Sequence, residues 1–334
     1  MATLPTGTPP ARQPRRHTLG FGFDAATRQL WRTPGGRPFA LRVWFWTAMA
    51  TAVALLLALP LIAPGYGEIL SLTGEVNSAT LEGRAPDPEL AAALNAALLR
   101  AAPGYALLAI GPWLAAVAGE GALHRKLFRG EEHPRIPLRF GADEWRILAT
   151  QLAVYGLMLL AYVVFILLAA VSAVGGMLLV GLAVIVGVPV LLWMLVWIPL
   201  RHCTAGALAV GDRAFRLAES RAVTKHRSGP LLGTYLFVWV VGNIAVYAVL
   251  TIVVLLVSGD AGMVAAGSGL GGADVEGRVA DFAARLRNPV FMLLAVLGAV
   301  AYAAVTALWF LTLSGVGAYA LRWYEADVPE RVFD

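Results

Sequence analysis

The sequence has little charge and almost no cysteine. Only 14% of its 334 residues are charged, against about 25% in soluble domains, whereas 59% are hydrophobic. This proportion of polar residues is too small to cover the surface of a water-soluble globular protein. Most of the chain must therefore be solvated by lipid. The single cysteine, Cys203, excludes an intrachain disulfide and any cysteine-based metal cluster within one chain.

Motifs that carry catalysis are also missing. We find no Gly-rich phosphate loop, no nucleophile and base at a productive spacing, and no HExxH helix. Glu132 and His133 are adjacent rather than spaced as metal ligands, and residues 121–146 are interpreted as a solvated or lipid-facing loop. We therefore predict that the protein is not an enzyme, with no catalytic residue, cofactor or metal.

Long apolar runs dominate what is present. A helix needs about 20 apolar residues to cross a hydrocarbon core about 30 Å thick. Six segments qualify, and the central two form a hairpin joined at residues 173–176. We predict an all-α, polytopic integral membrane bundle whose spans cover residues 43–61, 101–118, 147–172, 177–200, 231–257 and 290–319.

Turn and cap signals place some helix ends. The first span is expected to close at Pro60 and Pro64, because proline breaks the helical hydrogen-bond ladder. Asp87 and Pro88 are expected to begin the second helix as its N-cap and first residue. Outside the spans, residues 1–20 are predicted to be a disordered basic tail, and residues 21–334 a single membrane domain.

The amino-terminal end has alternative interpretations. A secretory signal peptide would have a shorter charged region and a shorter apolar run than this chain has, so we expect the segment to be retained. Residues 21–31 are predicted to form a short helix or turn at the headgroup level, with a solvated tail as the alternative.

Arginine and lysine set the orientation. If all six segments cross with the amino terminus inside, 21 of the 26 basic residues lie on the cytoplasmic side and 5 outside. If the second segment does not cross, the balance becomes 10 inside and 16 outside. Because positive loops stay cytoplasmic, we predict six crossings with both termini cytoplasmic, and we expect the basic excess to meet anionic lipid rather than nucleic acid.

Residues 213–224 are expected to form an amphipathic helix on the membrane surface, with Asp212 as its N-cap. Its apolar face would hold Ala214, Phe215, Ala218 and Ala222, and its polar face would hold Arg213, Arg216, Ser220 and Thr224. The residues expected to bind lipid headgroups or a partner protein are Arg139, Arg146, Arg213, Arg216 and Arg221.

Two features indicate helix packing. Asn243 lies near the middle of the fifth span, where a lone amide usually bonds a neighbouring helix. In the last span small residues recur every fourth position and form a smooth stripe that another backbone can approach closely. The stripe consists of Ala295, Ala299, Ala303 and Ala307.

Three segments resemble a known family. They are residues 139–146 (RFGADEWR), and 213–225 (RAFRLAESRAVTK) running into 231–235 (LLGTY). They look like segments of uncharacterised bacterial six-span proteins that are similar to the membrane domain of some glycerophosphoryl diester phosphodiesterases. In that family hydrolysis belongs to a separate soluble barrel, so the resemblance, over about residues 120–260, implies a membrane module and no catalytic residue.

These observations predict a non-catalytic, multi-pass module of a bacterial inner membrane that binds lipid or a partner protein at its cytoplasmic face. A homo-oligomer is a further possible partner arrangement. A facilitator or permease component for a neutral or lipid-like small molecule is the alternative. An ion-coupled transporter is disfavoured, because it would bury carboxylates or histidines within the membrane and the predicted spans contain none.

Overall fold

The computed structural model describes residues 21–81, 83–85, 87–133, 135–174, 176, 181, 183–225, 228–258 and 288–327. Within these residues every regular element is a helix, and six helices are long and apolar enough to cross a membrane. The longer helices are α2 (Gly36–Leu81), α3 (Pro88–Arg129), α4 (Ala142–Val174), α6 (Val188–His202), α9 (Ser228–Ser258) and α12 (Pro289–Asp327). The shorter ones are α1 (Phe23–Thr27), the 3-10 helix η1 (Gln29–Arg32), the π-helix η2 (Ala183–Gly187), α7 (Ala205–Gly211) and α8 (Leu217–Thr224).

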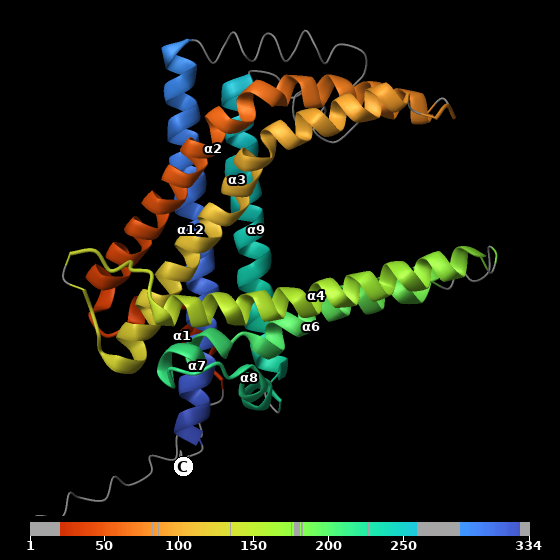
Figure 1. The fold of residues 1–334 in the computed structure, drawn as a ribbon. Coiled ribbons are helices and arrows are strands. Elements are labelled where there is room, and N and C mark those ends of the chain that lie inside the picture. The colour runs from red at the N-terminus through yellow and green to blue at the C-terminus, as the bar shows by residue number, and fades with distance from the viewer. Residues whose placement is uncertain are drawn as a thin grey trace, which may run out of the picture.

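Helices α2 and α3 run antiparallel and bend together partway along their length (Figure 1). Helix α2 does not end where the first span is predicted to close, at Pro60 and Pro64: the candidate span within it ends at Ile62, but the helix continues through both prolines to Leu81. A proline inside a helix removes a hydrogen bond and kinks the axis without necessarily ending it when a neighbouring helix packs alongside.

The start of α3 is as the sequence predicts. The Asp87 carboxylate accepts a hydrogen bond from the Glu89 N–H at 2.9 Å, and Pro88 occupies the first helical position. The helix then continues through Pro103 and Pro112 to Arg129.

Helix α12 contacts α2, α3 and α9. Of the alanine stripe, Ala303 and Ala307 are buried, and Ala303 packs with Ala52 of α2, whereas Ala295 and Ala299 are half-buried. The stripe therefore faces a helix of the same chain over its second half.

Helices α9 and α12 approach closely at a glycine. A Cβ at Gly242 of α9 would collide with the indole of Trp309 on α12. The neighbouring Asn243 donates its amide hydrogen to the Trp239 carbonyl oxygen of its own helix at 2.7 Å. Close contact between these helices is thus made by glycine and tryptophan, and the hydrogen bond of Asn243 stays within α9.

The segment before α2 packs beneath this bundle. Leu30 of η1 is fully buried, and a Cβ on Gly315 of α12 would lie 3.3 Å from the Leu30 backbone nitrogen. Phe21 meets Tyr319 and Trp323 edge-on, with ring centroids 5.2 and 5.4 Å away. The short helix predicted within residues 21–31 is present as α1 and η1, and its place at the headgroup level stays a prediction.

Helices α4 and α6 form the predicted hairpin, which projects crosswise to α9 and α12 (Figure 1). The most apolar part of α4 has no buried residue. A contiguous apolar surface of this size needs lipid or protein to cover it. The six helices qualify as spans by length and composition alone, so the six-crossing topology stays a prediction.

The close contact of α2 and α3 can be tested at Gly104. A Cβ there would lie 2.5 Å from Ile62 Cγ1 and 2.9 Å from Leu61 Cβ, so we expect Gly104→Ala to force the helices apart and cost about 1–3 kcal/mol. Gly156→Ala in α4 is the matched control, because nothing lies within 4 Å of its Cβ position. Thermal unfolding in detergent should show a lower Tm for the first variant only; equal melting temperatures would contradict the packing.

Candidate functional site

The candidate site lies where the end of α3 meets the start of α4. Helix α3 ends at Arg129, and the Gly130 that follows has a φ of +68°, the left-handed conformation that glycine favours at a helix C-terminus. Helix α4 begins with the Glu144 carboxylate accepting the Gly141 N–H at 2.8 Å, as in half of a capping box. Local signals thus fix both ends of the loop between them.

A buried ion pair joins the two helices. Arg125 Nη1 on α3 donates to Glu144 Oε1 on α4, and the two side chains are only 4% and 1% exposed. Arg125 Nη2 also donates to the Pro137 carbonyl oxygen at 3.4 Å. The prediction that residues 121–146 form a solvated or lipid-facing loop is wrong here, because Arg125, Asp143 and Glu144 are buried and residues up to 129 belong to α3.

Ion pairs surround this buried pair, and cations outnumber anions in them. Within the described residues, seven basic side chains share four carboxylates. The basic groups are Arg42, Arg125, Lys126, Arg129, Arg139, Arg146 and Arg213, and the acids are Glu131, Glu132, Asp143 and Glu144. The cluster as a whole therefore carries an excess of positive charge that can attract an anion.

The two loop glutamates organise these cations. Glu131 lies 3.2 Å from Arg129, 3.1 Å from Arg139 and 3.7 Å from Arg213. Glu132 binds Lys126 at 2.7 Å and also pairs with Arg42. The hydrogen bond from Lys126, with the nearby charge of Arg42, holds the pKa of Glu132 below its usual range, so this carboxylate stays ionised until the pH falls below that range.

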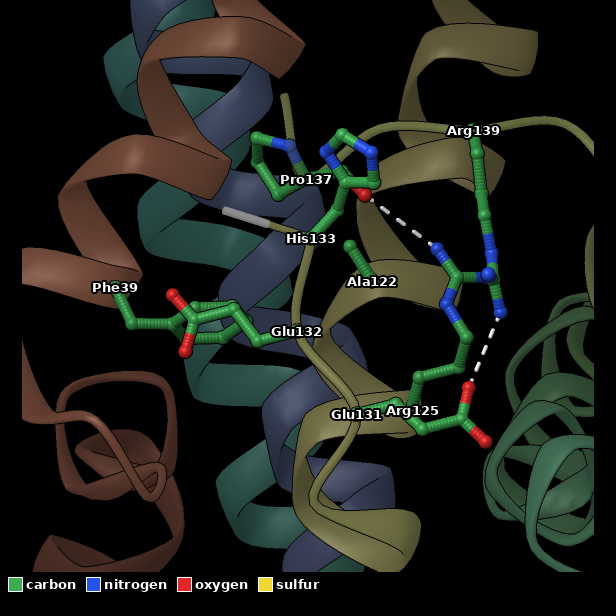
Figure 2. Close-up of a pocket in the computed structure, with 8 residues that line it drawn as sticks. All are labelled: Phe39, Ala122, Arg125, Glu131, Glu132, His133, Pro137 and Arg139. Atoms are coloured by element: carbon green, nitrogen blue, oxygen red, sulfur yellow. Dashed lines mark hydrogen bonds and ion pairs between the residues drawn. The ribbon is translucent and has the colours of Figure 1, made fainter. Parts of the chain in front are cut away.

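A cavity of about 290 Å³ opens among these groups. Figure 2 shows the Arg125 and Arg139 side chains pointing toward one another on one side of it, with Phe39 and Glu132 on the other. The full lining comprises Phe39, Ala122, Arg125, Glu131, Glu132, His133, Pro137 and Arg139. A guanidinium has five N–H donors, so a pair of arginines can hold its carboxylates and still offer hydrogens to an oxyanion.

A second polar cluster lies deeper, inside the bundle. Gln151 of α4 donates to Glu120 Oε2 of α3 at 2.8 Å and accepts from the Trp113 indole. His124 Nε2 lies 3.1 Å from the Ser314 hydroxyl of α12. Both groups lie past residue 118, where the predicted second span ends, but α3 continues through them to Arg129, so the helix carries a carboxylate and a histidine that the prediction placed outside the spans.

The predicted binding residues fall into two groups. Glu131 brings Arg139 and Arg213 together, and Arg146 pairs with Asp143 at 2.9 Å, so three of the five belong to the cluster beside the cavity. Arg216 and Arg221 lie apart, at the start and on the exposed face of α8.

The surface helix differs from its prediction. Asp212 follows the end of α7 and does not cap the next helix, because α8 begins only at Leu217 with Arg216 at its N-cap position. The Asp212 carboxylate pairs with Arg216 at 3.1 Å. The faces of α8 are also reversed, since Ser220 and Thr224 are buried while Ala218 and Ala222 are exposed. The two hydroxyls donate to the Arg201 carbonyl oxygen at the end of α6, which satisfies a group that the helix leaves unpaired.

The residues that the sequence did not identify are Arg125, Glu144 and the Glu120–His124 pair. One signal was available: Glu120 and His124 are four residues apart, so a helix extended beyond residue 118 would place them on one face. No local pattern indicates that Arg125 meets Glu144, because that contact depends on how α3 and α4 pack.

Comparisons of the chain with protein-family models, with curated proteins and with solved structures find no match. Among the described residues, no group of three or more His, Cys, Asp or Glu side chains could hold a metal ion.

The Arg125–Glu144 pair predicts strong coupling in a double-mutant cycle. Glu144→Gln keeps an acceptor for the Gly141 N–H but leaves the charge of Arg125 without its carboxylate. Arg125→Met leaves the charge of Glu144 without its guanidinium. Each variant should lower the free energy of unfolding by about 3–5 kcal/mol. The double variant should cost much less than the sum.

An exposed pair provides the control for this cycle. Arg100 and Glu68 lie 2.5 Å apart, with side chains 61% and 41% exposed, so the corresponding cycle should show coupling below about 1 kcal/mol. Denaturant unfolding in detergent micelles measures both cycles. Additive losses at Arg125 and Glu144 would contradict a buried pair.

Proposed function

We propose that this protein is a non-catalytic integral membrane module that binds the anionic headgroup of a membrane lipid at the cavity between α3 and α4. The observation that carries the proposal is the excess of cationic side chains over carboxylates around that cavity. Arginine is well suited to this role, because its fork of donors matches the oxygens of a phosphate.

The chemistry of the lining supports a lipid ligand. Arg125 and Arg139 supply N–H donors for a phosphodiester, while Phe39 and Pro137 provide an apolar wall suited to the glycerol and upper acyl region. Glu131 and Glu132 hold the surrounding cations in place through ion pairs. A headgroup with one negative charge fits this setting better than a neutral one, because it offsets part of the positive excess.

Charge placement supports the orientation. The basic cluster lies at the ends of helices that the positive-inside rule assigns to the cytoplasm, where the leaflet carries anionic lipid. We infer a multi-pass protein of a bacterial inner membrane with six crossings and both termini cytoplasmic. The resemblance to the membrane domain of glycerophosphoryl diester phosphodiesterases is in keeping with a membrane module that lacks its own catalytic residues.

Replacing Arg139 tests the proposal. We expect Arg139→Gln to weaken binding of phosphatidylglycerol to the full-length protein about fivefold, since one basic residue near a lipid surface contributes about 1 kcal/mol. Arg139 is 53% exposed, so its replacement leaves the buried pair intact. Native mass spectrometry of protein taken from nanodiscs of defined phosphatidylglycerol content reports the bound lipid.

The matched control is Arg100→Gln, which removes an arginine of similar exposure from an ion pair with Glu68 elsewhere on α3. It should leave phosphatidylglycerol binding unchanged, and phosphatidylcholine should bind weakly to every variant. Equal loss in both variants, or equal binding of the two lipids, would overturn the proposal.

A further inference from the structure

A different arginine is buried without an acceptor at the end of α6. Arg201 is 8% exposed, and the guanidinium carbon lies 5.2 Å from the centroid of the Trp197 ring. Its Nε and Nη1 atoms are fully buried and have no hydrogen-bond partner. A buried charged donor without an acceptor costs a large part of its lost hydration free energy.

A histidine and a second arginine lie close to Arg201. His202 follows on the same helix, and its Nδ1 is also buried without a partner. Arg221 of α8 lies close enough to act electrostatically on both residues. In the described part of the chain no carboxylate pairs with Arg201, His202 or Arg221, and the acids nearest in sequence, Asp212 and Glu219, are both paired with Arg216.

The fold holds these groups in a fixed relation. The hydroxyls of Ser220 and Thr224 bond the Arg201 carbonyl oxygen at 3.3 and 3.1 Å, and the Ser220 hydroxyl also meets that of Thr204 at 2.7 Å. These three hydroxyls are buried, so α8 is anchored against the end of α6. Arg221, one residue after Ser220, is thereby placed beside Arg201.

A purely structural role accounts for only part of this arrangement. The carboxyl end of a helix favours a cation, and the face of Trp197 does so as well. Neither interaction provides an acceptor in the plane of the guanidinium for Nε and Nη1. An oxyanion in that plane does, because its oxygen can accept a hydrogen from a charged N–H donor.

We propose that Arg201, His202 and Arg221 form a second anion site that takes a phosphate group, either free phosphate or the phosphate of a lipid headgroup. It lies on α6 and α8 and shares no residue with the lining of the cavity between α3 and α4. The site therefore stands or falls independently of the lipid function proposed for that cavity.

The test uses Arg201→Met, which keeps a long side chain against Trp197 and removes the unpaired charge. In phosphate-free buffer we expect this variant of the full-length protein, in detergent micelles, to melt at the same temperature as wild type or higher. Inorganic phosphate in excess should raise the Tm of wild type by about 2–4 °C and leave that of the variant unchanged.

Two further variants make the result specific. Arg221→Gln replaces an exposed arginine. It should roughly halve the rise in Tm that phosphate causes and leave the Tm in phosphate-free buffer unchanged. Arg28→Gln removes an arginine that is 65% exposed and paired with Asp24. Inorganic phosphate should raise the Tm of this variant as much as that of wild type.

A lipid arm identifies the source of the phosphate. If Arg201→Met retains less phosphatidic acid than wild type in native mass spectra, and inorganic phosphate changes the Tm of neither protein, the ligand is a lipid headgroup. If inorganic phosphate raises the Tm of wild type but not that of Arg201→Met, the ligand is free phosphate. Both results support the site. A lower phosphate-free Tm for Arg201→Met, with phosphate and phosphatidic acid acting alike on variant and wild type, would overturn it.

Discussion

The buried ion pair between Arg125 and Glu144 is the interaction on which the basic end of this protein depends. It links α3, and through it α2, to α4 and the hairpin that α4 begins. Glu144 uses its two oxygens separately, one for Arg125 and one for the Gly141 N–H. Because a charge left alone at this depth is strongly unfavourable, the pair fixes where α4 starts relative to α3.

That constraint places the surrounding charges where they can act together. With α3 and α4 held, the loop between them presents Glu131 and Glu132, and these gather cations from α2, α3, the loop itself and the segment after α7. The carboxylates are fewer than the cations, so the end of the bundle remains positive around a cavity with one apolar wall. Lipid recognition is the use that this combination supports best, because a phospholipid headgroup joins a negative charge to an apolar body.

Much of the architecture follows from the sequence. Length and hydropathy identify the six long helices, and local chemistry identifies the Asp87–Pro88 start of α3 and the acidic first turn of α4. These features depend on a few consecutive residues, so they can be predicted without knowledge of the packing. The same is true of the short helices before α2.

The predictions that fail concern features that are set by packing between helices. Pro60 and Pro64 do not end α2, because α3 supports the helix on the far side of them. Ser220 and Thr224 point inward, against a simple division into polar and apolar faces, because the end of α6 offers them a carbonyl oxygen. Arg125 and Glu144 are 19 residues apart, and no pattern along the chain shows that they meet.

The lipid function proposed for the cavity between α3 and α4 requires that lipid surrounds the long helices and that their basic ends share the cytoplasmic side. The hairpin of α4 and α6 is the sharpest case, since its apolar surface is uncovered and it runs crosswise to α9 and α12 (Figure 1). Compartment-sensitive reporters fused after His133, Gly176 and Asp212 in living cells measure its path directly. We expect the reporters after His133 and Asp212 to lie in the cytoplasm and the reporter after Gly176 on the opposite side. A cytoplasmic signal from Gly176, or an external one from His133, would contradict the proposed orientation.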